Sequence, residues 1–284
     1  MEKILVTGAG GQLGQEMKVM AARFPQYEFI AVTREELPVD DEAKLLAFFS
    51  RHLPAYLVNC AAYTAVDKAE SEKELAFAVN ATATGNLARV CETFRTRFIH
   101  ISTDYVFDGD AAVPYREDDP TGPQGVYGQS KLEGEEQAKA FNPGAIIIRT
   151  AWVYSSFGKN FVKTMLRLMK EKAEIGVVND QFGSPTYAAD LAAAIWQIIN
   201  CGEWHPGTYH YSNNGVITWY DFAVAIKEIT GSACIVNPIT TSQYPTPAKR
   251  PAYSVLDTTK IARTFRLNIQ PWEKSLRDCL KLLS

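Results

Sequence analysis

The sequence predicts an α/β fold with a doubly wound parallel sheet and a smaller C-terminal α/β lobe. Short apolar runs alternate with helical patterns up to residue 150. Strands that alternate with helices form a parallel sheet covered on both faces. The first run, residues 3–7, leads through a glycine-rich turn into a helical pattern. A strand, a glycine turn and a helix in this order are typical of a Rossmann-type unit.

The composition is that of an ordinary globular protein. The chain has 284 residues, 46% of them hydrophobic and 21% charged, enough for one large or two modest domains. A net charge of −3 argues against a role in binding nucleic acid or a membrane surface. The five cysteines form no Cys-x-x-Cys motif and favour reduced thiols. We find no signal peptide or membrane-spanning apolar run, so we expect a cytoplasmic protein.

The glycine-rich turn predicts a dinucleotide site. Gly8, Gly11 and Gly14 form a Gly-x-x-Gly-x-x-Gly motif between the first strand and the first helix. This spacing allows a tight turn, a bare backbone beside a pyrophosphate and close helix–strand packing. The helix N-terminus then directs free N–H groups at the phosphates. The alternative is a flexible glycine-rich turn, but the flanking strand and helix favour the dinucleotide site.

The end of the second expected strand, residues 28–33, indicates which dinucleotide is bound. In this fold an acidic residue near that point binds the ribose 2′-hydroxyl of NAD. Thr33 and Arg34 stand there instead, followed by Glu35 and Glu36. Because an arginine can pair with a 2′-phosphate, we expect NADPH as the cofactor and NADH as a second choice. A solvated charged loop is the alternative interpretation.

The alternation continues through the next hundred residues. Asp40 or Asp41 is expected to cap a helix that begins just after them. Small residues follow the third strand, where they let a cofactor approach the backbone. The residues 102–104 end the fourth strand, at the sheet edge where such folds place their chemistry. The expected strands are 55–59, 97–101 and 145–150, and the expected helices are 70–78, 81–94 and 127–140.

Beyond residue 152 the alternation loosens. The stretch 242–252 holds three prolines and is expected to be loop. We expect an NADP-binding domain over residues 1–151, to which helix 187–200 returns, and a substrate lobe over most of 152–284. The expected helices are 161–172, 187–199, 219–229 and 272–283, and the expected strands are 175–178, 209–211 and 235–237.

Tyr127 and Lys131 form a Tyr-x-x-x-Lys pair at the start of an expected helix. Residues four apart lie on the same helix face, one turn from each other. An ammonium beside a phenol favours the phenolate, so we expect Lys131 to lower the pKa of Tyr127 from its usual value of about 10. Such a tyrosine can exchange a proton in carbonyl–alcohol interconversion. An ordinary amphipathic helix start is the alternative.

Together the glycine turn, the hydroxyl residue after the fourth strand and the Tyr-x-x-x-Lys pair resemble the extended short-chain dehydrogenase/reductase family. The resemblance implies a catalytic set of Thr103, Tyr127 and Lys131. In that family the hydroxyl polarises the carbonyl, the tyrosine transfers the proton, and the lysine lowers the pKa of the tyrosine and holds the nicotinamide ribose. Thr103 is chosen over Ser102 by its spacing from Phe107.

Nearly the whole chain has a closer resemblance, to the dTDP-4-dehydrorhamnose reductase family. The resemblance implies NADPH-dependent reduction of the 4-keto group of dTDP-4-dehydro-6-deoxy-L-mannose to dTDP-L-rhamnose. Tyr105 stands where sugar 4,6-dehydratases typically carry a catalytic glutamate. The runs that carry this resemblance are 11–14 (GQLG), 102–109 (STDYVFDG), 127–131 (YGQSK), 149–154 (RTAWVY), 180–186 (DQFGSPT) and 249–251 (KRP).

The motifs and the resemblance together define the expected site. Trp152 is expected to line the sugar pocket, with core packing as the alternative. Arg250 is expected to meet the diphosphate, with a surface role as the alternative. The expected cofactor-binding residues are Gly8, Gly10, Gly11, Gln12, Leu13, Gly14, Arg34, Asp40, Ala61, Ala62, Tyr63, Tyr127 and Lys131. The expected substrate-binding residues are Thr103, Asp104, Tyr105, Tyr127, Trp152 and Arg250.

The sequence gives no indication of a catalytic metal, because the four histidines form no cluster. Some members of the reductase family dimerise through magnesium held by carboxylates. Glu16 matches one such position, but Ala189 stands where a second carboxylate is needed beside Asp190. We expect a monomer or homodimer. Two alternative functions remain open: a nucleotide-sugar epimerase or dehydratase, and a non-catalytic dinucleotide-binding subunit resembling the regulatory subunit of methionine adenosyltransferase.

Overall fold

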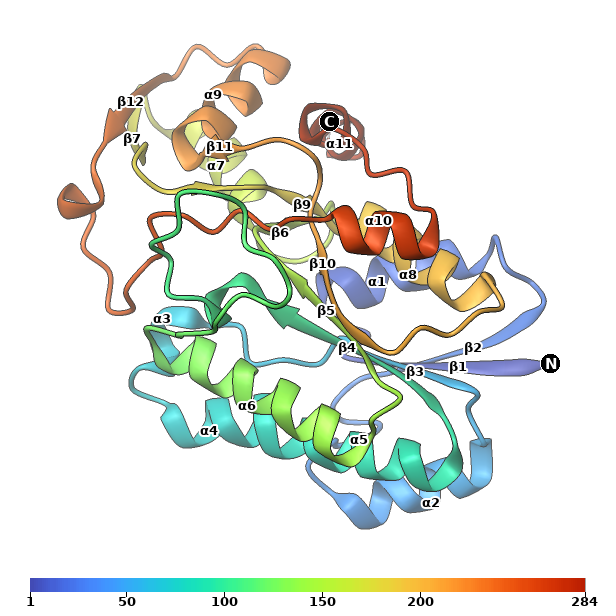
Figure 1. The fold of residues 1–284 in the computed structure, drawn as a ribbon. Coiled ribbons are helices and arrows are strands. Elements are labelled where there is room, and N and C mark those ends of the chain that lie inside the picture. Colours follow the sequence, from blue (N-terminus) through green and yellow to red (C-terminus); the bar gives the residue numbers. More distant parts are fainter. Residues whose placement is uncertain (284) are drawn as a thin grey trace.

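A six-stranded parallel sheet lies at the centre of the computed structural model, which describes residues 1–283 (Figure 1). The strand order is β10-β5-β4-β3-β1-β2, and every neighbouring pair is parallel. This arrangement confirms the predicted doubly wound α/β fold. The strands are β1 (Glu2–Thr7), β2 (Tyr27–Val32), β3 (Tyr56–Asn59), β4 (Arg97–Thr103), β5 (Ile146–Thr150) and β10 (Gly207–Tyr211).

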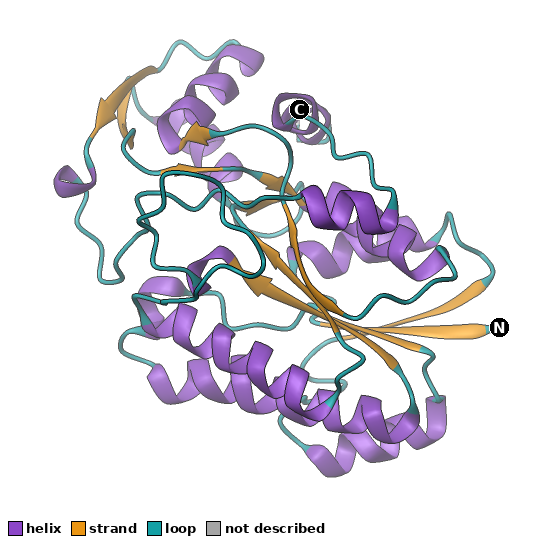
Figure 2. Ribbon diagram, in the orientation of Figure 1, coloured by secondary structure: helices purple, strands orange, loops and turns teal. Residues whose placement is uncertain are grey.

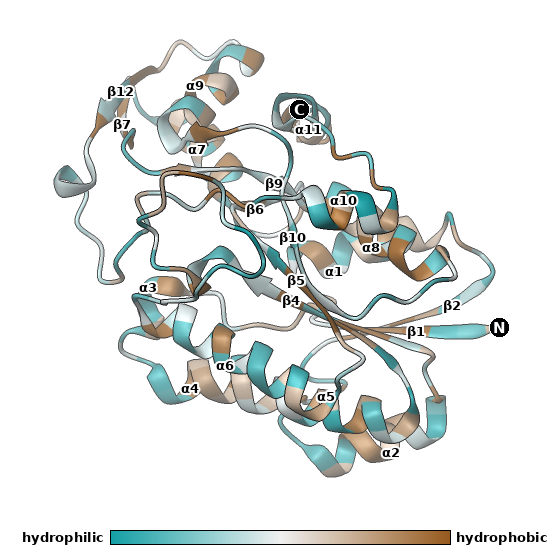
Figure 3. Cartoon of the chain, in the orientation of Figure 1, coloured by the Kyte–Doolittle hydropathy of each residue, from teal (hydrophilic) through white to brown (hydrophobic). Residues whose placement is uncertain are grey.

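Helices cover both faces of this sheet (Figure 2). One face carries α1 (Gln12–Ala21), α8 (Ala188–Asn200) and α10 (Thr259–Phe265). The other carries α2 (Glu42–His52), α5 (Ala83–Phe94) and α6 (Val126–Phe141). In Figure 3 the hydrophobic colour follows the central strands where they pass between the two helix layers. The burial of these strands on both faces explains why their sequences are continuous apolar runs.

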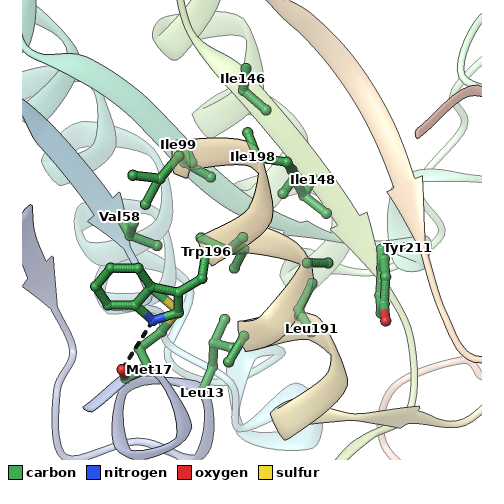
Figure 4. Packing of buried hydrophobic residues seen from close by; sticks show 14 of the residues in the cluster. Leu13, Met17, Val58, Ile99, Ile146, Ile148, Leu191, Trp196, Ile198 and Tyr211 are labelled. Carbon is green, nitrogen blue, oxygen red and sulfur yellow. Dashed lines mark hydrogen bonds between the residues drawn. The ribbon is translucent and has the colours of Figure 1, made fainter. Parts of the chain in front are cut away.

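Trp196 of α8 is the largest fully buried side chain and holds α8 to α1 (Figure 4). Its ring stacks on Phe24 with centroids 4.6 Å apart, and its Nε1–H donates to the backbone oxygen of Met17 at 3.2 Å. A buried indole usually needs such an acceptor. Residues 188–200 therefore pack on the sheet that carries the N-terminal strands.

A second packed unit lies beyond the end of the sheet, at the upper left of Figure 1. Its core is a separate hydrophobic cluster that includes Val162, Phe222 and Leu276. The helices of this unit are α7 (Phe161–Glu171), α9 (Trp219–Thr230) and α11 (Trp272–Lys281). Its short strands are β6 (Val153–Tyr154) paired with β9 (Thr186–Tyr187), β7 (Glu174–Val178) paired with β12 (Ile235–Ile239), and β8 (Phe182–Gly183) paired with β11 (Ile217–Thr218).

Several local predictions need correction. The two helices expected over 70–78 and 81–94 are instead α3 (Val66–Ala69), then α4 (Lys73–Phe77), which continues through a π-helical turn (Ala78–Thr82) into α5. That turn carries Asn80, whose side chain bonds both backbone groups of Tyr63 and the hydroxyl of Ser130. The strand expected at 209–211 is longer and joins the main sheet beside β5. Helix α10 was not expected.

The capping prediction for α2 is confirmed at one of its two candidates. The side chain of Asp41 accepts a hydrogen bond from the Lys44 N–H at 3.0 Å, so Asp41 rather than Asp40 is the N-cap.

Within residues 1–283, none of the helices combines the length and the apolar character needed to cross a membrane.

Candidate active site

Two adjoining cavities lie along the carboxyl ends of the central strands, with volumes of about 560 and 420 Å³. They share Gly11, Cys60 and Ala62 in their linings, so together they form one elongated cleft. All the sequence-predicted cofactor-binding residues line one or both cavities. The cleft lies where open parallel sheets bind their ligands.

The glycine turn forms the floor of this cleft. Gly8 has a φ of +67°, and a Cβ there would lie 2.6 Å from the Ala61 nitrogen. A Cβ on Gly14 would lie 2.5 Å from the Gly8 oxygen, so this glycine lets α1 pack against the turn. A Cβ on Gly10 would meet no atom of the described residues within 4 Å, because this glycine opens onto the cleft.

The start of α1 suits an anionic group. Its N-cap is Gly11, and among the described residues no side chain caps this helix end. Uncapped N–H groups and the helix dipole favour a phosphate there. The bare backbone at Gly10 leaves room for the pyrophosphate of a dinucleotide. The residues present therefore fit the cofactor that the sequence predicts.

Arg34 and Asp40 lie together at the far end of the cleft, in the lining of the 420 Å³ cavity. The Arg34 guanidinium is 3.8 Å from the Asp40 carboxylate, and both side chains are more than half exposed. An exposed pair of this length is weak, so the guanidinium is free to reorient toward a ligand phosphate.

The three predicted catalytic residues line the 560 Å³ cavity from two elements. Thr103 ends β4, while Tyr127 and Lys131 occupy the first two turns of α6. Gly128 allows α6 to approach the turn that follows β4, because a Cβ there would lie 2.2 Å from the Tyr105 oxygen. The Val126 N–H at the helix start donates to Glu70 at 3.0 Å. The fold therefore brings the predicted catalytic residues to one wall.

Burial is the largest cause of the pKa shifts of Tyr127 and Lys131. It raises the pKa of Tyr127 to about 12, although the Thr103 hydroxyl acts in the opposite direction. It lowers the pKa of Lys131 to about 8. The expected net lowering of the Tyr127 pKa is therefore wrong for this structure, because burial sets its direction. The Lys131 ammonium donates to the Ile101 oxygen at 2.6 Å.

Asp104 is the acidic neighbour of this set. Its carboxylate is 4% exposed and accepts a hydrogen bond from the Thr103 hydroxyl at 2.9 Å. Burial raises its pKa to about 6. Its Oδ2 is buried, as is the hydroxyl of Ser254, which acts on this carboxylate and lowers its pKa against the effect of burial.

Trp152 also lines the 560 Å³ cavity and stacks on Trp219, with ring centroids 3.5 Å apart and planes 11° from parallel. Trp152 has a φ of +48°, a strained conformation for a bulky residue. Gly183 makes room for its ring, since a Cβ there would lie 2.5 Å from the indole. Trp219 was not among the predicted site residues, because it lies on α9 and reaches the cleft only through the packing of the second unit.

Arg250 lies outside the 560 Å³ cavity. It lines a neighbouring cavity of about 680 Å³, which meets the first one at Tyr105 and Trp219. Its Nη2 is 2.7 Å from the Asp67 carboxylate. Asp67 was not among the predicted site residues, because its place in this cavity depends on the ion pair with Arg250, which is distant in the chain.

Glu16 is buried in this chain, at 5% exposed, and accepts a hydrogen bond from the Ser155 hydroxyl at 2.6 Å. Burial raises its pKa, and the charge of Asp190 adds to the shift. The hydrogen bond between Glu16 and Ser155 therefore joins α1 to the segment after β6.

Among residues 1–283, no group of three or more His, Cys, Asp or Glu side chains is placed to hold a metal ion.

Comparison with known proteins places this chain in a family. The family profile described as "RmlD substrate binding domain" matches residues 1–284. A dTDP-4-dehydrorhamnose reductase of Aggregatibacter actinomycetemcomitans is 41% identical and is matched over 98% of both chains.

Solved structures of dTDP-4-dehydrorhamnose reductases are also similar to this chain. One of a dTDP-4-dehydrorhamnose reductase from Clostridium acetobutylicum superposes with a TM-score of 0.95 at 42% identity, covering 99% of both chains. Another, from Bacillus anthracis in complex with NADP, has a TM-score of 0.94 at 36% identity and the same coverage. The chain therefore belongs to the RmlD family, the family of the dTDP-4-dehydrorhamnose reductases.

Proposed function

We propose that the chain reduces the 4-keto group of dTDP-4-dehydro-6-deoxy-L-mannose to give dTDP-L-rhamnose, with NADPH as the reductant. The observation that carries the proposal is the meeting of Thr103, Tyr127 and Lys131 in one cavity that continues into the glycine turn. Family membership supports an NAD(P)H-dependent oxidoreductase. The NADP complex of the Bacillus anthracis relative supports the choice of cofactor.

The chain's own residues have separate tasks in this reaction. When bound, the reduced nicotinamide supplies a hydride to the carbonyl carbon. The Thr103 hydroxyl, which donates to Asp104 in the structure, turns to donate its one proton to the carbonyl oxygen, where negative charge develops. The Tyr127 hydroxyl gives that oxygen its proton, and the Lys131 ammonium favours the resulting phenolate. The product is an alcohol, and Tyr127 regains a proton before the next cycle.

The acidic groups in the cavity favour a reductase over a dehydratase. Removing water from a hexose requires an acid and a base beside the sugar. Among the described residues that line the 560 Å³ cavity, Asp104 is the only carboxylate. Tyr105 packs its ring edge-on against Tyr127, with centroids 5.5 Å apart, in place of a second acid. A single hydride transfer needs no second carboxylate.

We propose further that Trp152 and Trp219 form the wall against which the sugar lies, and that Arg250 meets the diphosphate. The cavity beside Arg250 is large enough for a nucleotide. In this proposal residues 1–151 and 187–200 bind the NADP, and most of 152–284 forms the substrate lobe. Strand β10 and helix α10 belong to the second part of the chain but pack on the sheet of the first.

A direct assay tests the proposed reaction. Purified dTDP-4-dehydro-6-deoxy-L-mannose is mixed with the protein and NADPH, and the loss of absorbance at the reduced nicotinamide band is followed while the product is identified by mass. We expect NADPH oxidation that depends on the sugar and a product two mass units heavier. No sugar-dependent oxidation under conditions where both ligands bind would contradict the proposal.

Arg34→Ala is expected to weaken the binding of NADPH more than that of NADH. Only NADPH carries the 2′-phosphate, and a charged hydrogen bond to it is worth about 1.5–3 kcal/mol, or about 10–150-fold in the dissociation constant. Dissociation constants for both dinucleotides check this by fluorescence titration. Arg51→Ala is the matched control, because Arg51 is an exposed arginine on α2 outside the lining of the cleft. Equal weakening of both dinucleotides would rule out recognition of the phosphate.

A further inference from the structure

His100 is a fully buried histidine directly behind the catalytic lysine. It lies on β4 with no exposed surface, and its Nε2 is 3.4 Å from the Lys131 Nζ. Its other ring nitrogen, Nδ1, is 3.1 Å from the Asn59 Nδ2. Burial, and then the charge of Lys131, lowers the pKa of His100 well below its ordinary value, so the ring is neutral. A neutral imidazole carries its proton on one nitrogen only.

The hydrogen bonds of Asn59 decide which nitrogen that is. The Ala61 backbone N–H is a fixed donor and bonds the Asn59 Oδ1 at 3.2 Å, while the Thr7 hydroxyl donates to the same oxygen at 2.7 Å. Turning the amide over would set its NH₂ against the Ala61 N–H. The Asn59 Nδ2–H therefore donates to His100, whose Nδ1 accepts and whose proton lies on Nε2.

This tautomer has a consequence for Lys131. An ammonium has donors but no acceptor, so it cannot accept from the Nε2–H that faces it. An uncharged amine has a lone pair and can accept that hydrogen bond while donating to the Ile101 oxygen at 2.6 Å. The contact with His100 thus favours the amine form. The other ionisable groups near Lys131 are Cys60, whose anion would favour the ammonium, Glu135, which does the same, and Tyr127.

We propose that His100 is a positioning residue that donates its Nε2–H to Lys131 and so shifts the lysine toward its uncharged form. This inference rests on the proposed function, in which it makes Lys131 able to release a proton near neutral pH. The reduction consumes one proton per cycle at Tyr127. A lysine that titrates close to working pH is a proton store within the same cavity, whereas an ordinary lysine would hold its proton.

The lowered pKa of Lys131, about 8, agrees with this arrangement. Burial is the largest cause of that shift, and we expect the orientation of His100 to lower the pKa of Lys131 further. The two causes can be separated because a glutamine at position 100 keeps the site filled but can turn its amide oxygen toward the ammonium.

The first test uses the unaltered protein without ligands. Nitrogen-15 NMR of labelled histidine reports the tautomer of His100, with its signals assigned by their loss in His100→Gln. We expect a protonated Nε2 and an unprotonated Nδ1 from neutral pH down to the acid limit of the folded state. A protonated Nδ1, or an imidazolium at neutral pH, would overturn the proposal without any change to the protein.

The second test measures the pKa of Lys131 in the same ligand-free protein, by the carbon-13 shift of its ε-methylene, assigned with Lys131→Met. His100→Gln is expected to raise this pKa by about one unit, a tenfold change in the ratio of ammonium to amine. His210→Gln is the matched control, because His210 is equally buried but bonds the Tyr115 oxygen. It should leave the Lys131 titration unchanged. An unchanged or lowered Lys131 pKa in folded His100→Gln would refute the proposal.

The pH dependence of turnover separates a positioning role of His100 from a purely structural one, because a structural role would leave the pH profile in place. The alkaline limb of the pH profile is expected to shift upward in His100→Gln in step with the pKa of Lys131. The NMR results are independent of whether the sugar is reduced, so failure of the proposed reaction leaves them standing. Conversely, a wrong tautomer would remove the role of His100 while leaving the reductase proposal intact.

Discussion

Tyr127→Phe is expected to lower turnover by about 10²–10⁴-fold, the usual contribution of general acid–base catalysis. Phenylalanine keeps the ring that packs beside Tyr105 and removes only the hydroxyl. Cofactor binding should therefore change little, because the glycine turn and the start of α1 are untouched. Single-turnover rates and dinucleotide dissociation constants measure the two effects separately.

Tyr105→Phe is the matched control for this variant. It removes a neighbouring hydroxyl from the same cavity but leaves the proposed proton donor in place. We expect it to retain most of the turnover. If Tyr127→Phe kept turnover within about twofold of the unaltered protein, another group would have to be the acid.

Arg149→Met is expected to destabilise the fold by about 3–5 kcal/mol, because it leaves a buried carboxylate without its main partner. Arg149 on β5 forms a bidentate pair with Glu135 on α6, with both contacts at 2.8 Å. The two side chains are 3% and 0% exposed. The pair ties α6, which carries Tyr127, to the sheet, so its loss should also loosen the position of Tyr127.

Urea unfolding measures this effect. The double variant Glu135→Met with Arg149→Met should recover much of the lost stability, since no unpaired charge remains. Arg167→Met is the matched control, because its pair with Glu171 is equally short, at 2.7 Å, but more than half exposed. That exposed pair is worth at most about 1 kcal/mol. A cost for Arg149→Met no larger than for Arg167→Met would contradict the account of the buried pair.

Local patterns were enough to predict the central sheet and most of the residues that line the cleft. The glycine turn and the Tyr-x-x-x-Lys spacing each depend on residues close in sequence, where the backbone geometry limits the outcome. Helix α10 escaped prediction because its seven residues are too few to show a clear period. The π-helical turn carries Asn80, whose contacts with Tyr63 and Ser130 no local pattern reveals.

The parts of the site that sequence could not supply come from packing between distant segments. Trp219 reaches Trp152, far from it in the chain, only because the second unit folds over the end of the sheet. The pKa of Tyr127 was predicted from its neighbour Lys131 alone. Its direction is set instead by burial, which depends on everything packed around the phenol. Electrostatics in a closed site thus follows from the whole fold.

The central claim is that a reduced nicotinamide is consumed as a co-substrate in a single hydride transfer. The most direct measurement is the number of NADPH molecules oxidised for each sugar reduced, together with a trial on dTDP-glucose without added reductant. We expect one NADPH per sugar and no reaction of dTDP-glucose. Loss of water from dTDP-glucose, or an epimerised sugar without net oxidation of NADPH, would contradict the account and indicate an enzyme that recycles its cofactor.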